Sequence, residues 1–203
     1  MTVTAMSDRD LKIWLCARPY LDVRNNDEHT LQSYWIVRAL LAVHTEARED
    51  IVLPAMILHD IGWKRVPQDQ LLNAIGPSPS RPDLVRVHEV EGAAIAREEF
   101  GGMGLPLEAI AAIIDGHDTR KEAISLEDAL VKDADKVWRF TPHGVATMCR
   151  WWDWTEDKAR TVLSDFVVPQ LLTTPGRAMA LGFLATAAAT LATPELMTAE
   201  ARQ

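Results

Sequence analysis

Apolar residues recur at helical spacing along nearly the whole 203-residue chain, whereas alternating runs of Val, Ile and Thr that would form strands are nearly absent. Leu53, Met56, Ile57 and Asp60, for example, follow the i, i+3, i+4, i+7 spacing of one helix face. The apolar fraction of 48% and charged fraction of 25% are typical of a globular protein with a sizeable core. The sequence therefore predicts an all-α fold.

Helix-start and helix-stop residues divide the first two thirds of the chain into six predicted helices. These helices are expected over residues 8–17, 29–47, 51–61, 83–100, 107–117 and 126–138, and the first should end near Pro19. Residues 62–82 are rich in Gly and Pro, which predicts a functional loop that could form a lid. The alanine-rich residues 178–192 are interpreted as a buried helix that either closes the core or forms a dimer contact.

Charge and composition limit the partners that we expect. A net charge of -8 repels phosphate backbones, so no nucleic-acid polymer is expected to bind. The first ten residues are polar and acidic, unlike a signal peptide, and no apolar stretch is long enough to predict a membrane span. We therefore expect a cytoplasmic protein that binds a small molecule, with a homodimer as one possibility.

Four of the six histidines, His29, His59, His88 and His117, are spaced about thirty residues apart. In an antiparallel bundle this interval lets successive side chains return to one level of the interior, where bundles hold metal sites. Asp60 lies in the apolar segment PAMILHDIG, and a buried carboxylate needs a compensating cation. A mixed set of imidazole and carboxylate ligands suits a divalent transition metal.

The order of these residues resembles the pattern H, HD, H, H, D of the HD-domain superfamily of metal-dependent phosphohydrolases. The segments that carry the resemblance are DEHT, ILHDIGW, VHEVEGAAIA, IDGHD and LVKDADKVWRF, within about residues 19–142. The resemblance implies an all-α helical bundle with the metal site in its core. It also implies a single domain over residues 1–203, in which C-terminal helices from about 143 to 203 pack on the core.

The resemblance further implies which residues bind metal. His29, His59, Asp60 and Asp135 would hold one ion, while His88 and His117 would join a second ion that Asp60 bridges. Asp133 is a weaker candidate than Asp135 for the final ligand. One or two divalent ions are expected, with iron preferred over manganese, cobalt, nickel or magnesium.

The implied activity is hydrolysis of a small phosphorylated metabolite or a nucleotide by a metal-activated hydroxide. We expect Asp60 to take part in catalysis, together with Asp118 beside His117 and Glu91 one turn after His88. Basic residues close to the motifs are the expected phosphate contacts, and the preferred ones are Arg24, Lys64 and Lys121. Trp63 and the tryptophans near residue 151 could stack on a nucleobase or pack in the core.

Two alternatives stay open. Residues 28–32 are similar to the corresponding segment of HD-type diiron oxygenases that cleave C–P bonds, and Tyr20 precedes His29 by nearly the interval of a tyrosine near their iron. The segment around Asp135 is more similar to the hydrolases, which are therefore preferred. A silent binding module, whose metal only braces the fold, is disfavoured because a structural site does not need six ligands.

Overall fold

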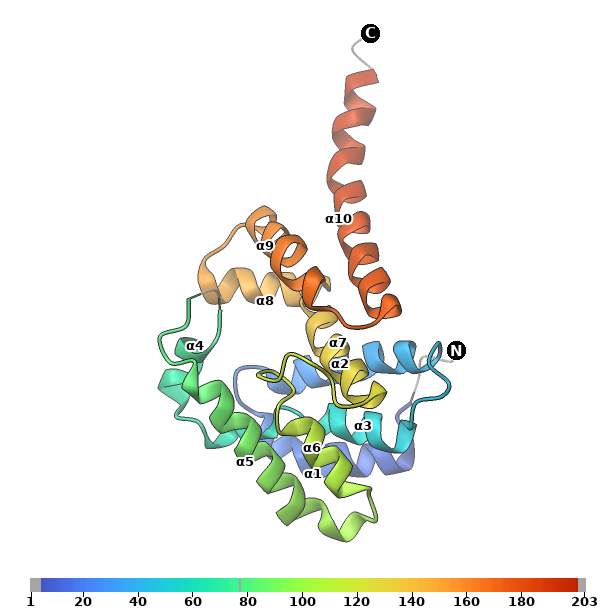
Figure 1. Ribbon diagram of the computed structural model, residues 1–203. Helices are drawn as coiled ribbons and strands as arrows, with labels where there is room; N and C mark the ends of the chain where they lie inside the picture. Colours follow the sequence, from blue (N-terminus) through green and yellow to red (C-terminus); the bar gives the residue numbers. More distant parts are fainter. Residues whose placement is uncertain (1–4, 77, 201–203) are drawn as a thin grey trace.

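The computed structural model describes residues 5–76 and 78–200. All regular structure within these ranges is helical, so the predicted all-α class is confirmed. Figure 1 shows α1 to α7 gathered in the lower part of the view, with α8, α9 and α10 above them. None of the helices in the described ranges is both long and apolar enough to cross a bilayer.

The first helix, α1 (Asp8–Leu21), begins at Ser7, whose side chain accepts a hydrogen bond from the Asp10 N–H. The predicted end at residue 17 is too early: the helix continues through Pro19 and ends half a turn later, at Leu21. A proline inside a helix removes one backbone hydrogen bond. Burial of Leu21, which is fully covered, offsets that loss here.

The bundle core forms where α2 (Asn26–Leu41) packs against α3 (Glu49–Leu58) and α7 (Leu126–Trp138). Every residue of α3 from Ile51 to Leu58 is buried, as expected for a helix that is apolar on all sides. On the other side, α5 (Asp83–Phe100) packs against α6 (Leu107–Ile114) and the short turn η1 (Ile61–Arg65).

Several predicted helix ends were wrong by a few residues, although α5 and α7 have the predicted bounds. The second helix starts at Asn26 and ends at Leu41, and the turn that follows it is largely exposed. The fifth predicted helix, 107–117, ends at Ile114 before Gly116, whose φ of +127° no helix tolerates. The predicted loop 62–82 contains η1, η2 (Gln68–Gln70) and α4 (Leu71–Ala74), which cover a small second core around Trp63.

The C-terminal part forms α8 (Pro142–Trp152), α9 (Glu156–Val162), the π-helical turn η4 (Leu163–Val167), the turn η5 (Val168–Gln170) and α10 (Thr174–Glu200). Asp133 of α7 accepts hydrogen bonds from the N–H groups of Leu172 and Thr173, at 2.7 and 2.8 Å, just before α10 begins. This carboxylate therefore fixes the start of α10 to the bundle.

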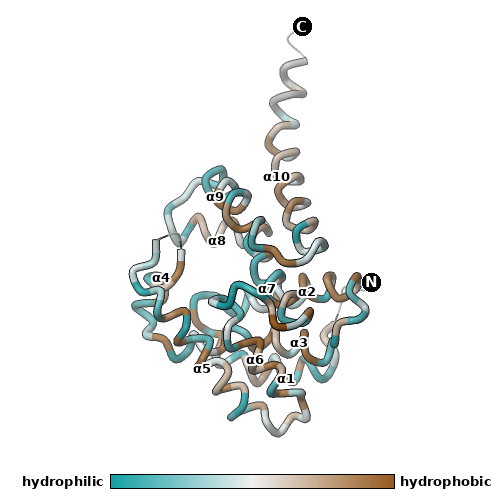
Figure 2. Tube along the Cα trace, viewed as in Figure 1, coloured by the Kyte–Doolittle hydropathy of each residue, from teal (hydrophilic) through white to brown (hydrophobic). Residues whose placement is uncertain are grey.

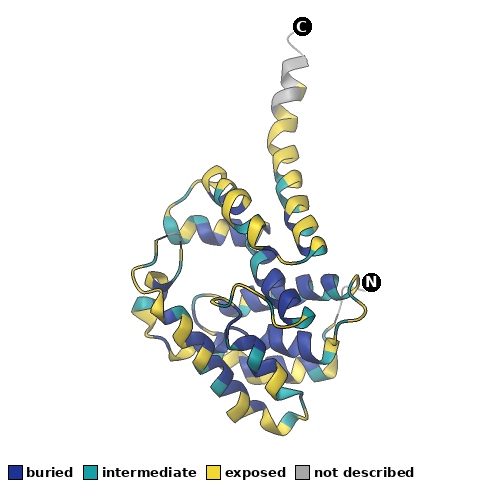
Figure 3. Ribbon diagram, viewed as in Figure 1, coloured by how far each residue is buried: buried dark blue, intermediate teal, exposed yellow. Residues whose placement is uncertain are grey.

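The interpretation of residues 178–192 as a buried helix is wrong. Beyond its first turns α10 projects away from the body, and most of its described side chains are exposed (Figures 1 and 3). Leu181, Leu191 and Met197 are 48%, 54% and 64% exposed. Figure 2 shows that apolar and weakly polar residues nevertheless follow one another along much of this helix. Apolar composition alone did not distinguish a buried helix from an exposed one.

We predict that a chain ending at Ala185 folds as stably as the full chain. The side chains described between residues 186 and 197 are nearly all exposed, so removing residues 186–203 should change the free energy of unfolding by less than about 1 kcal/mol. Leu171→Ala is the positive control, because this side chain is 3% exposed at the root of α10 and its truncation should cost about 2–4 kcal/mol. Urea denaturation measures both, and a large loss in the shortened chain would contradict the prediction.

Candidate metal centre

Six side chains from five parts of the chain meet in the interior of the bundle. His29 lies on α2, His88 on α5 and Asp135 on α7. The remaining three, His59, Asp60 and His117, occupy the turns that follow α3 and α6. All six are at most 6% exposed. Residues spread over more than one hundred positions are thus brought to one buried point.

The two oxygens of Asp60 face two different pairs of histidines. Its Oδ2 lies 3.5 Å from His29 Nε2 and 3.6 Å from His59 Nε2, and these two nitrogens are 3.0 Å apart. Its Oδ1 lies 3.6 Å from His88 Nε2 and 3.5 Å from His117 Nε2, which are 3.3 Å apart. One carboxylate therefore stands between two clusters of donor atoms, as a bridging ligand does.

Asp135 completes the first cluster, since its Oδ1 is 3.4 Å from His29 Nε2 and 3.9 Å from His59 Nε2. Asp118 borders the second cluster, with Oδ2 at 3.7 Å from His88 Nε2 and 3.8 Å from His117 Nε2. Nitrogen and oxygen donors thus lie on both sides of Asp60.

Backbone contacts orient two of the imidazole rings toward the cluster centre. The Nδ1 of His59 hydrogen-bonds with Met56 O at 2.8 Å, and the Nδ1 of His117 with Ile114 O at 2.9 Å. A carbonyl oxygen can only accept, so both Nδ1 atoms carry the proton and both Nε2 lone pairs point inward. A divalent cation fits these converging lone pairs.

The charges in the cluster also favour a cation. Burial lowers the pKa of His59 and of His88 to about 4, so both rings are neutral donors at pH 7. Burial acts in the same direction on His117, but Asp118 and Asp60 raise its pKa to about 9, so without metal this ring is protonated at pH 7 and a bound cation would displace its Nε2 proton. Although burial opposes ionisation of Asp60, its histidine neighbours hold the pKa of this carboxyl well below its usual value. Asp60 therefore stays an anion in the core.

The comparison with protein families agrees with this geometry. The family model of the HD domain matches residues 26–139, more than half of the chain and all six cluster residues. The chain belongs to the HD-domain family. Neither the curated proteins nor the solved structures yielded a match to it. Divalent-metal binding is a property of the family, and the donor atoms around Asp60 fit that property.

Gly62 and Trp63 fix the HD segment against α5. A Cβ atom on Gly62 would lie 1.8 Å from His88 O, so only glycine permits this close approach of η1 and α5. The Trp63 ring stacks on the His88 ring at a centroid distance of 4.0 Å, and its Nε1 donates to Asp60 Oδ1 at 3.0 Å. Trp63 thus contacts two of the cluster residues, His88 on α5 and Asp60 just before η1.

Glu89 is a functional candidate that the sequence interpretation missed. It is fully buried, and its Oε1 accepts hydrogen bonds from the N–H groups of Asp118 and Thr119, both at 2.8 Å. Its Oε2 accepts from the Thr119 hydroxyl at 2.6 Å and from Arg86 at 2.9 Å. Burial opposes ionisation, but these donors lower the pKa of Glu89 to about 2. A buried carboxylate beside His88 therefore holds the turn that carries His117.

Glu91, the expected catalytic carboxylate, is placed differently. It is half-buried on α5, and within the described ranges no hydrogen bond or ion pair joins it to the cluster. The sequence does contain a signal for Glu89, because this residue directly follows His88. Residues that support a metal ligand are part of a metal site, and a carboxylate beside a ligand is a candidate for that role. Glu91 was preferred because it lies one helical turn after His88 on the same helix. That spacing says nothing about Glu89, whose partner is a loop 29 residues away along the chain.

Lys132 supports the same turn from α7. It is 2% exposed, and its ammonium donates to the carbonyl oxygens of Gly116, His117 and Arg120 at 2.6, 2.9 and 2.7 Å. Asp133, the weaker candidate for the last ligand, points instead to the start of α10 and takes no part in the cluster. Three charged residues close together on α7 therefore have different partners: Lys132 binds the turn that carries His117, Asp133 binds the start of α10, and Asp135 belongs to the cluster.

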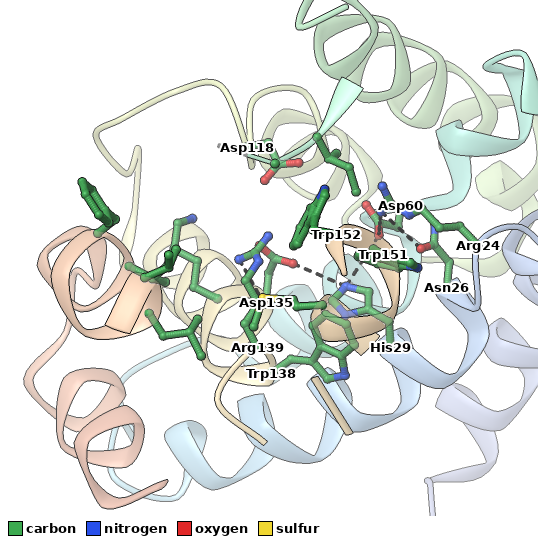
Figure 4. A pocket seen from close by; sticks show the side chains of 18 of the residues that line it. Arg24, Asn26, His29, Asp60, Asp118, Asp135, Trp138, Arg139, Trp151 and Trp152 are labelled. Atoms are coloured by element: carbon green, nitrogen blue, oxygen red, sulfur yellow. Dashed lines mark hydrogen bonds and ion pairs between the residues drawn. The ribbon is translucent and has the colours of Figure 1, made fainter. Parts of the chain in front are cut away.

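Of the three expected phosphate contacts, only Arg24 lies beside the cluster. Arg24 lines a cavity of about 500 Å³ beside the cluster, and its Nη2 lies 4.0 Å from Asp60 Oδ2. Lys64 pairs with Asp22 at the surface, and Lys121 is exposed outside the cavity lining. Arg139, which the sequence interpretation did not single out, lines the cavity and contacts Asp135 at 3.2 Å. Figure 4 shows that Arg24 and Arg139 approach the cluster from different elements.

We predict that Glu89→Gln weakens metal binding while Glu91→Gln does not. The amide of the first variant cannot accept all four hydrogen bonds of the carboxylate, so the turn with His117 loosens and metal affinity should fall about 10- to 100-fold. Competition with a chromophoric chelator measures the affinity. Equal affinities for the two variants would contradict the positioning role of Glu89.

Proposed function

We propose that the protein is a metal-dependent phosphohydrolase that acts on a small phosphorylated metabolite or nucleotide. The observation that carries this proposal is the guanidinium group of Arg24 beside the metal cluster. Its Nε and Nη1 are buried and have no hydrogen-bond partner in the described part of the chain. A buried cation with free donors is unfavourable unless an anion joins it, and a phosphate group fits that need.

The local backbone supports the role of Arg24 as an anion ligand. Arg24 and Asn25 both have left-handed conformations, with φ of 53° and 61°, which are uncommon for residues with a side chain. Arg24 also lies against the rings of Trp63 at 4.6 Å and Trp151 at 5.2 Å. The strained turn and the two indoles together hold the guanidinium at the rim of the cluster.

The residues that would bind metal are those assigned by the family pattern. His29, His59, Asp60 and Asp135 would hold one divalent transition-metal ion, and Asp60, His88 and His117 a second, with iron preferred. Such ions supply a hydroxide nucleophile from water at neutral pH and polarise phosphoryl oxygens.

The protein's own residues would then orient the substrate. Arg24 and Arg139 would bind phosphoryl oxygens from two sides and hold the phosphorus next to the cluster. Asp118 lines the same cavity and would exchange a proton with the leaving oxygen. Its backbone is fixed through Glu89, which keeps the carboxylate at the cavity edge.

An HD-type diiron oxygenase that cleaves a C–P or C–C bond with O2 is the second candidate. The six donors on two sides of Asp60 favour it as well, because two irons can share such a carboxylate. Tyr20 gives it no further support, since this side chain interacts with Glu99 and does not line the cavity.

Metal analysis and spectroscopy distinguish the two candidates. For the hydrolase we expect bound divalent metal by elemental analysis, phosphatase activity with several metals, and loss of both metal and activity in Asp60→Ala. Mössbauer or EPR spectra of a mixed-valent iron pair that an organophosphonate perturbs would favour the oxygenase instead. A protein that retains no metal would contradict both functions.

We predict that Arg24→Met raises KM for a phosphate ester without changing metal content. Loss of a charge-assisted contact to phosphate should raise KM about tenfold or more. Lys64→Met is the matched control, because its ammonium pairs with Asp22 outside the cavity, and its KM should stay close to wild type. Steady-state kinetics on both variants test this, and an unchanged KM in Arg24→Met would remove the main support for a phosphate substrate.

A further inference from the structure

The lining of the cavity beside the cluster consists of a charged set of residues, called here the charged end, and an apolar set, called here the apolar end. Arg24, Asp118, Lys136 and Arg139 lie at the charged end with the metal-binding residues. The apolar end is a wall formed by α8, α9, η4 and the turn between α8 and α9, and its side chains include Trp151, Trp152, Trp154, Leu163, Phe166 and Val167. A ligand that fills this space must therefore join an anionic group to an apolar body.

The tryptophans of this wall form a continuous aromatic surface that begins at the phosphate contact. The Arg24 guanidinium lies over the Trp151 ring, with its Cζ 5.2 Å from the ring centroid. The Trp151 and Trp152 rings are 5.7 Å apart, and the Trp152 and Trp154 rings 4.9 Å apart. A group attached to a phosphate at Arg24 would thus meet indole rings directly.

Groups that could recognise a sugar or polyol are scarce at the apolar end. Apart from the indole N–H groups, Gln170 is the polar side chain that the described C-terminal residues contribute to the lining. Its Nε2 already donates to Phe166 O at 2.6 Å. Several hydroxyl groups placed there would lose water and gain few partners, which is unfavourable.

The segment between η1 and α5 closes this wall from the opposite side. Ile75 and Gly76 line the cavity, and a Cβ on Gly76 would lie 2.8 Å from Trp152 Nε1. Gly76 has a φ of +100°, so a glycine is required there both for its conformation and for its close approach to the indole. Gly76 therefore packs against the edge of the Trp152 ring, and both residues line the cavity.

We propose that the preferred substrate is a phosphate monoester of an uncharged aromatic alcohol, whose ring stacks on the wall around Trp152. This inference rests on the proposed phosphohydrolase function. A cavity of about 500 Å³ accommodates such a molecule. In the reaction water supplies the new oxygen on phosphorus, the P–O bond to the alcohol breaks, and a proton goes to the departing oxygen, so no oxidant is needed.

The test compares three esters of primary alcohols, whose leaving groups are matched, on the metal-loaded full chain: 1-naphthylmethyl phosphate, adenosine 5′-monophosphate and glycerol 1-phosphate. We expect kcat/KM for the naphthyl ester to exceed that for the glycerol ester by about tenfold or more, as stacking on an indole provides. Trp152→Leu should lower kcat/KM for the naphthyl ester about tenfold and leave the glycerol ester within about twofold. Trp35→Leu is the matched control, because Trp35 is half-buried on α2 and lies outside the cavity lining.

Binding of 1-naphthylmethylphosphonate, measured by calorimetry, separates this inference from the proposed function. If no ester is hydrolysed but the phosphonate binds and Trp152→Leu weakens it, the hydrolase function fails and the aromatic site stands. If esters are hydrolysed but Trp152→Leu changes neither binding nor selectivity, the aromatic site is overturned. Tenfold preference for the nucleotide or the glycerol ester would overturn it as well.

A second variant protects the test against misfolding. Phe166 lines the same cavity but is 66% exposed, so Phe166→Ser should fold normally and still reduce the preference for the naphthyl ester. Unchanged selectivity in a folded Phe166→Ser together with a misfolded Trp152→Leu would count against the proposal.

Discussion

The carboxylate of Asp60, buried between two pairs of histidines, is the constraint on which the rest of the structure depends. An anion in an apolar core is tolerated only where positive charge compensates it. The four Nε2 atoms within 3.6 Å of its two oxygens lie on both sides of this side chain, where they would bind the cations that supply that charge. Each helix that contributes a ligand must then reach this point, which sets how the bundle packs.

The sequence was sufficient to predict the fold class and the residues that meet around Asp60. Helical periodicity is local, so it can be read without knowledge of the tertiary structure. The long α10 was misjudged because an alanine-rich helix has no pattern that tells whether a neighbour covers it. Helix ends such as Leu41 and Ile114 depended on packing and on a single turn glycine, which periodicity does not report.

The supporting residues of the site were harder to predict than its ligands. Glu89, Lys132 and Asp133 each bind the backbone of a distant segment, between 12 and 40 residues away along the chain. No spacing rule relates such a side chain to the loop that it holds, because the loop supplies only main-chain groups. Arg24 was found from its nearness to His29, whereas Lys64, equally near a ligand in sequence, faces Asp22 instead.

The aromatic wall and the metal cluster occupy separate stretches of the chain. Every cluster residue lies within the family match at residues 26–139, while Trp151, Trp152 and Trp154 follow it. Mutations in α8, α9 and η4 can therefore reshape the apolar end without displacing any metal-binding side chain. Such an arrangement lets evolution change which molecule is accepted while the reactive centre is inherited intact, so divergence among related chains should concentrate after residue 139.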